Sequence, residues 1–66
     1  MTDEDLAKAE AKALSLEDAA GFWGALASTS EARGLAGSEI ARERERELLA
    51  MALYLRARIK LAGAEG

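Results

Sequence analysis

The sequence predicts an all-α fold: an antiparallel helical hairpin that associates into a multi-helix bundle or ring. The chain contains no proline, and its dominant residues (Ala, Leu, Glu, Arg and Lys) are the strongest helix formers. Two long stretches repeat apolar residues in steps of three and four, which is the spacing of one face of a helix. Residues 33–37 separate the stretches, and so short a connection makes two helices antiparallel neighbours.

The first helix is expected over about residues 3–32. Thr2 and Asp5 have the spacing of a capping box, and the acidic residues there suit the positive end of the helix dipole. Ser15 and Asp18 form a second such box, so the helix either continues through Ser15 or breaks near it. A seven-residue frame crosses this point and comprises Leu6, Ala9, Ala13, Leu16, Ala20, Trp23, Ala27 and Ser30.

The second helix is expected over residues 38–62. Gly34 suits the left-handed position that closes a helix, and Ser38 is the expected N-cap of the next one. Gly63 should end the second helix and leave residues 64–66 frayed. The frame of this helix comprises Ala41, Glu45, Leu48, Ala52, Leu55, Ile59 and Ala62.

Folding the chain back about Leu35 aligns the two frames and sets large side chains against small ones, which favours close packing. The predicted hairpin core comprises Leu16, Ala20, Trp23, Leu48, Met51, Ala52, Leu55 and Ile59. Gly21 and Gly24 lie inside the first frame, where each costs about 1 kcal/mol relative to alanine. They either let another backbone approach closely or are only weak spots.

The run 48–55 is apolar at every position. A helix that is apolar all round must be covered all round, and one short neighbouring helix cannot do this. The side chains left outside the seam predict a surface for copies of the chain or for another protein. They are Phe22, Leu26, Leu49, Leu53, Tyr54 and Leu61. A dimer that forms a four-helix bundle is the simplest closed assembly, and a larger ring is the next.

The 66 residues are expected to form a single domain, 1–66. Domains this small are marginally stable and rely on disulfides, a metal or association. The chain has neither Cys nor His, which removes disulfides, the commonest zinc ligands and the usual general base. We therefore expect association, with no metal, no cofactor, no catalytic residues and no enzymatic activity.

The net charge of −3 is unevenly distributed. Residues 1–31 hold seven acids and two lysines, whereas the remainder holds seven bases and five acids. Arg and Glu alternate over residues 42–47, which indicates either a solvated face or ion pairs between subunits. The candidates for such pairs are Arg42, Glu43, Glu45 and Arg46. Each of these arginines has a Glu neighbour that would repel phosphate, which disfavours nucleic-acid binding.

The chain begins with acidic residues where a signal peptide would be basic. The apolar run 48–55 is much shorter than the roughly 20 residues that span a bilayer. These features predict a cytoplasmic protein without a membrane partner or a small-molecule substrate.

Together, these patterns predict a non-catalytic, self-associating adaptor or structural protein, with copies of itself and another protein as partners. The alternative is a nucleic-acid-associated module. Hairpins of this size resemble the ring-forming segment of phage-type small terminases, which are packaging subunits, and small secretion-system co-chaperones. Both are analogies of architecture that rest on no particular residue.

Overall fold

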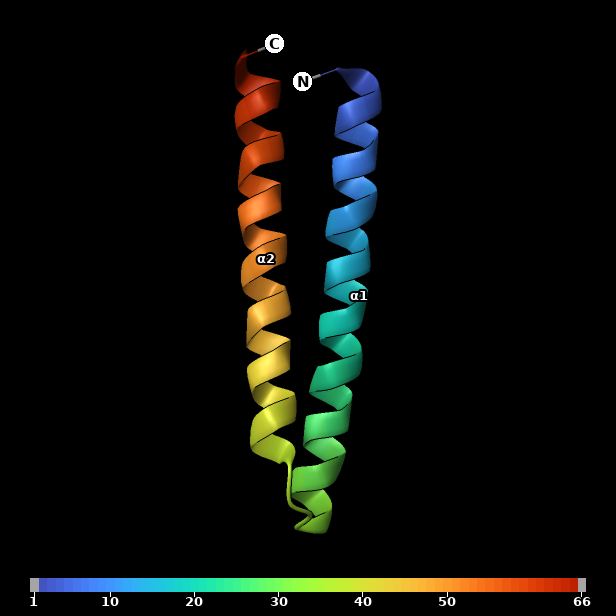
Figure 1. The fold of residues 1–66 in the computed structure, drawn as a ribbon, viewed down its shortest axis with the longest axis vertical. Coiled ribbons are helices and arrows are strands. Elements are labelled where there is room, and N and C mark those ends of the chain that lie inside the picture. Colours follow the sequence, from blue (N-terminus) through green and yellow to red (C-terminus); the bar gives the residue numbers. More distant parts are fainter. Residues whose placement is uncertain (1, 66) are drawn as a thin grey trace.

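The computed structural model describes residues 2–65, which form two helices, α1 (Asp3–Arg33) and α2 (Ser38–Glu65). The helices lie side by side and antiparallel, and the start of α1 and the end of α2 lie together (Figure 1). The predicted all-α hairpin is confirmed.

Helix α1 begins at a reciprocal cap and continues without a break. The Thr2 hydroxyl accepts a hydrogen bond from the Asp5 amide at 3.1 Å, and the Asp5 carboxylate accepts one from the Thr2 amide at 3.5 Å. The predicted capping box is therefore confirmed. Of the two alternatives at Ser15, the structure shows the continuous helix. A break there would interrupt the packing of Ala13 and Leu16, which are both buried against α2.

Helix α1 ends at its C-cap Gly34, whose backbone is in the left-handed region with φ 67° and ψ 26°. Its amide donates to the Glu31 carbonyl at 3.2 Å, and the Leu35 amide donates to the Ser30 carbonyl at 2.8 Å. This pattern satisfies the last carbonyls of α1 and needs a residue that tolerates positive φ. The predicted left-handed Gly34 is thus confirmed.

The predicted start of α2 at residue 38 is confirmed, but the cap residue and the C-terminal end differ from the prediction. The Gly37 carbonyl accepts from the Ala41 amide at 3.2 Å, so Gly37 is at the cap position and Ser38 is the first residue of the helix. At the other end α2 continues through Gly63 to Glu65, because glycine weakens a helix by only about 1 kcal/mol and need not end it. Of the expected frayed segment, Gly66 lies outside the described residues.

The seam between the helices is built mainly from alanine. Its buried apolar residues are Ala13, Leu16, Ala20, Ala27, Ala41 and Ala52, all of which belong to the two predicted frames. Trp23, Leu48, Leu55 and Ile59 are half-buried. Among the described residues no side chain larger than alanine is fully buried. Small residues let the helices approach closely, but they bury little apolar area.

Met51 is the one predicted core residue that lies outside the seam, because its side chain is 52% exposed. Ala52, the next residue, is buried. Consecutive residues of a helix point in directions about 100° apart. A narrow seam centred on Ala52 therefore leaves the Met51 side chain beside the seam.

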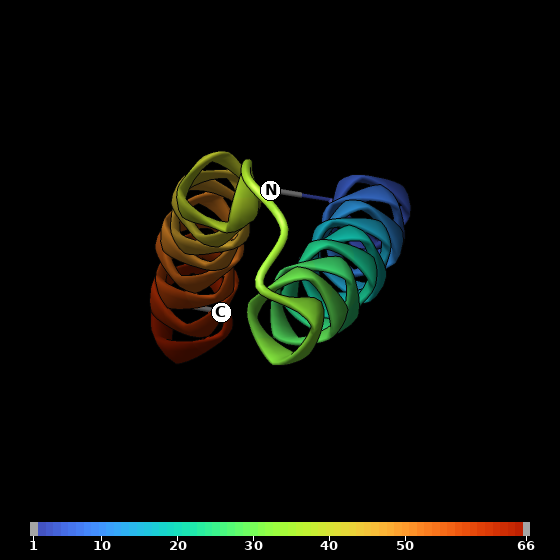
Figure 2. The same cartoon turned by 90° about the horizontal axis from the view of Figure 1, so that it is seen from below.

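The hairpin is a long, thin slab that measures 50 × 15 × 12 Å. Its radius of gyration is 15.0 Å, compared with about 11 Å for a compact chain of this length. Figure 2, viewed along the helices, shows the two helices in a single layer, and no third element formed by residues 2–65 lies over either face. Both broad faces of the slab are therefore open in the single chain.

Candidate association surface

The two broad faces of the hairpin differ in chemistry. Residues seven apart lie on the same side of a helix, so the contacts between α1 and α2 assign each seven-residue series to a face. We call one face the charged face, and it is defined by Glu17, Glu31, Arg42 and Arg56. We call the other the apolar face, and it is defined by Phe22, Leu26, Ile40, Met51, Tyr54 and Leu61.

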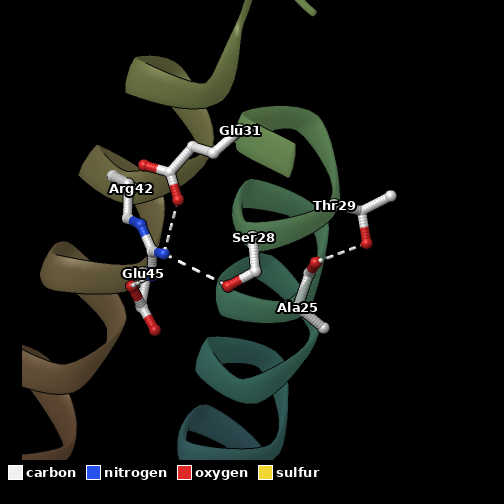
Figure 3. Close-up of polar contacts among 6 residues, drawn as sticks. All are labelled: Ala25, Ser28, Thr29, Glu31, Arg42 and Glu45. Carbon is white, nitrogen blue, oxygen red and sulfur yellow. Dashed lines mark hydrogen bonds and ion pairs between the residues drawn. The ribbon is translucent and has the colours of Figure 1, made fainter. Parts of the chain in front are cut away.

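Near the turn, Arg42 links the two helices on the charged face. Its guanidinium lies 2.7 Å from the Glu31 carboxylate of α1 and 3.0 Å from the Glu45 carboxylate of α2. It also donates to the Ser28 hydroxyl at 3.2 Å (Figure 3). Opposite Glu45, α1 presents Gly24, where an added Cβ would collide with the Glu45 carboxylate. Gly24 thus makes room for a side chain, whereas the two alternatives drawn from the sequence were a close approach of another backbone and a weak spot.

A second bridge on the charged face links Arg56 to Glu17 at 2.7 Å. The hydrogen bond from Arg56 holds the pKa of Glu17 below its usual value, and the hydrogen bond from Arg42 does the same to the pKa of Glu31. Both arginine pKa values are raised in return, mainly by the same hydrogen bonds. Each bridge joins α1 to α2, so together they fix the register of the hairpin.

Leu49 belongs to the charged face. It lies seven residues after Arg42 and seven before Arg56, so its side chain stands between the two bridges. Leu53, one turn further along, follows at the outer edge of the same side and is 70% exposed. The charged face therefore includes exposed leucines, but cations flank them.

The apolar face is centred on a shallow open hollow next to the seam. The hollow is lined by Lys12, Leu16, Ala50, Met51, Tyr54 and Leu55. Leu26 lies fourteen residues after Lys12, and Phe22 lies one turn before Leu26, so the same side of α1 continues toward the turn. Ile40 and Leu61 lie fourteen residues before and seven residues after Tyr54, and they extend the apolar face along α2 in the same way.

Aromatic groups account for much of the apolar face. The Phe22 ring meets the half-buried Trp23 edge-on, with ring centroids 5.8 Å apart. Tyr54 accepts a hydrogen bond from Arg58 at 3.2 Å, and the Arg58 guanidinium lies 5.8 Å from the centre of the Tyr54 ring. Phe22 and Tyr54 nevertheless remain 64% exposed, so these contacts leave most of both rings uncovered.

All six residues predicted to form an interface are exposed, but they do not share one surface. Phe22, Leu26, Tyr54 and Leu61 lie on the apolar face, whereas Leu49 and Leu53 lie on the side of the two bridges. Ile40 and Met51 were not predicted as members of this surface. The spacing of Ile40 from Tyr54 and Leu61, in multiples of seven, is a signal that would have placed it there.

The four predicted intersubunit charges also separate. Arg42 and Glu45 form bridges within the chain, whereas Glu43 and Arg46 line a polar hollow on α2 with Glu39 and Glu47. Arg44 pairs with Glu47 at 3.4 Å, and both side chains are largely exposed. The side chains of Arg42 and Glu45 are engaged in closing the hairpin, so they are poor candidates for intersubunit pairs.

The described residues include no cluster of three or more His, Cys, Asp or Glu side chains with metal-binding geometry. Over the same residues, neither helix combines the length and the apolarity required to cross a bilayer. Comparisons of the chain with protein-family models, with curated proteins and with solved structures returned no match.

Proposed function

We propose that this protein is a non-catalytic helical building block that works by association. Its hairpin presents exposed apolar side chains to copies of itself, or to a partner protein, and the contact completes a core that the single hairpin lacks. Its role would be structural or adaptor-like within a larger assembly.

The alanine-rich seam is the observation that supports this proposal. Over the part of the chain that the structure describes, five of the six buried apolar residues are alanines, while ten large apolar side chains are exposed. Each large apolar side chain left in water forgoes about 1.5–3 kcal/mol of burial. The distribution is the reverse of the one expected for a domain that folds alone, in which the largest apolar side chains fill the core.

The accessible surface supports the same proposal. The chain has an accessible surface of 4924 Å², whereas a compact monomer of 7.0 kDa has about 4,000 Å². The excess of about 900 Å² is close to the roughly 800 Å² that each partner buries in a standard protein–protein interface. Association through one face of the slab would remove it.

Sedimentation equilibrium over a wide range of protein concentrations tests the proposal. We expect a mass that is a multiple of 7.0 kDa at high concentration and that falls on dilution as the helical circular dichroism is lost. A fully helical species that keeps the mass of one chain at every concentration, alone and in the extract of its natural host, would contradict it.

A further inference from the structure

We infer that a second copy of this chain occupies the apolar face, stacked face to face on the first, with the two turns at opposite ends of a four-helix bundle. This inference rests on the proposed function and specifies its partner, its face and its orientation. Three observations support it: the area of the apolar face, the absence of salt bridges there between the described residues of α1 and α2, and the charge pattern along α1.

The area of the apolar face matches that of a dimer interface. An aromatic side chain has roughly 150–250 Å² to bury, so Phe22 and Tyr54, each 64% exposed, leave more than about 100 Å² apiece uncovered. Leu26, Ile40, Met51 and Leu61 add comparable exposed areas along the same face. A twofold contact buries the same patch on both copies, which brings the total into the usual range of about 1,200–2,000 Å².

The charged face is less suited to this contact. Its two bridges place Glu17, Glu31, Arg42 and Arg56 across the seam. Stacking another copy on them would remove water from paired charges, and that desolvation can exceed the Coulombic gain. On the apolar face the described salt bridges stay within one helix, as Glu4–Lys8 and Arg44–Glu47 do. Their side chains are more than half exposed and can remain at the rim.

The orientation follows from one seven-residue series on α1. Asp5, Lys12, Ala19, Leu26 and Arg33 follow one another at this spacing on the apolar side. The series has an acid at one end, a cation at the other and a small residue at its centre. If two copies of α1 run antiparallel with the twofold axis at Ala19, Asp5 of each copy faces Arg33 of the other, and Lys12 faces Leu26.

The charges of α2 agree with this orientation. The bridges Glu17–Arg56 and Glu31–Arg42 set the register, which puts Ala19 level with Tyr54. With the twofold axis at that level, Arg58 of one copy lies nearer to Glu47 of the other than to Arg44. The opposite arrangement, with both turns at one end, would gather Lys12 and Arg58 of both copies together, and such like-charge contacts are unfavourable.

The distance between two spin labels at the turns tests the orientation. Leu35 is exposed in the turn, and the chain has no cysteine of its own, so Leu35→Cys gives one label per chain. Pulsed dipolar spectroscopy should give a label separation close to the 50 Å length of the hairpin. Turns at the same end would instead bring the labels within about 20 Å, since packed helices are 8–10 Å apart.

The outcomes separate the two proposals. A short label distance in a sample with the mass of a dimer would overturn the orientation inferred here and leave the proposed self-association intact. A sample with the mass of one chain and no dipolar coupling would overturn self-association itself. Circular dichroism of the labelled variant must match the parent chain before either result is read.

Two single-cysteine variants test whether the apolar face is the one that forms the dimer contact. Ala19→Cys lies on the proposed twofold axis, where a residue meets its own copy, and Leu53→Cys lies outside the apolar face although Leu53 is 70% exposed. Mild oxidation should link Ala19→Cys chains into dimers in several-fold higher yield than Leu53→Cys chains. Equal yields, or faster linkage of the more exposed Leu53→Cys, would overturn the assignment of the apolar face.

Discussion

The two faces of the hairpin are built on the same seven-residue repeat but use it differently. On the charged face, Arg42 and Arg56 reach across the seam to Glu31 and Glu17, so the polar groups of one helix are satisfied by the other. On the apolar face, Met51 and Tyr54 stay exposed beside an open hollow. The comparison teaches that a hairpin can fix its register with one face and leave the other incomplete.

We expect the largest effect when a glutamate is introduced on the apolar face. The same substitution at a residue of similar exposure on the charged face is its control. Met51→Glu buries an unpaired carboxylate in the proposed contact. This should reduce the free energy of dimerisation by about 3 kcal/mol and weaken dimerisation roughly a hundredfold. Leu49→Glu places the same group between Arg42 and Arg56, where cations can accommodate it. Sedimentation velocity of both variants measures the difference. Equal loss of assembly in the two would mean that the faces are not distinct.

A substitution in the seam should have the next largest effect. Ala20 is buried between the helices, so Ala20→Leu forces them apart and should lower the free energy of unfolding by about 1–3 kcal/mol. Ala25→Leu, at an exposed position of the same helix, is the matched control and should change it little. Urea denaturation at a fixed protein concentration gives both values. A stabilised Ala20→Leu variant would show that the seam has room to spare.

The two helical glycines of α1 should respond differently to alanine. Gly21 has open space around its Cα, so Gly21→Ala should raise the free energy of unfolding by about 1 kcal/mol through helix propensity alone. Gly24→Ala should gain less, because its methyl group must displace the Glu45 carboxylate that pairs with Arg42. Thermal melting compares the two variants. An equal gain at both positions would mean that the Glu45 side chain moves freely.

The smallest effect is the pH dependence of the charged face. The folded-state pKa values of Glu17 and Glu31 are lowered from 4.5, so the unfolded chain takes up protons first as the pH falls. The stability from these bridges is present above about pH 4.5 and is lost as the pH falls through the folded-state pKa values. The melting temperature should drop by a few degrees across this range, and less in a Glu17→Gln/Glu31→Gln double variant. An unchanged slope in the double variant would exclude the bridges as the cause.

The apolar frames were sufficient to predict the two helices, their antiparallel pairing and the buried seam. The seven-residue repeat rests on many positions in each helix. A single unfavourable residue such as Gly63 therefore did not prevent a correct prediction that the two helices exist. Helix ends were less predictable, because Ser38 and Gly63 are each compatible with two adjacent roles.

The division into two faces was not predicted from the sequence. The sequence-based prediction treated all apolar residues outside the seam as one surface, whereas the bridges from Arg42 and Arg56 show which flanks of α1 and α2 lie together. Without these contacts, Leu49 and Tyr54 are both simply residues outside the seam. Met51 was misplaced for a related reason, since an alanine-rich seam is narrower than one built from leucine.

The most direct test of the central claim, that the hairpin lacks a sufficient core until another copy covers it, is the dependence of its melting temperature on protein concentration. Trp23, half-buried at the border between the seam and the apolar face, reports unfolding by its fluorescence. For folding coupled to dimerisation, the melting temperature should rise steadily with each tenfold increase in concentration. A melting temperature that is the same at every concentration would mean that the alanine seam is sufficient alone, and would contradict the claim.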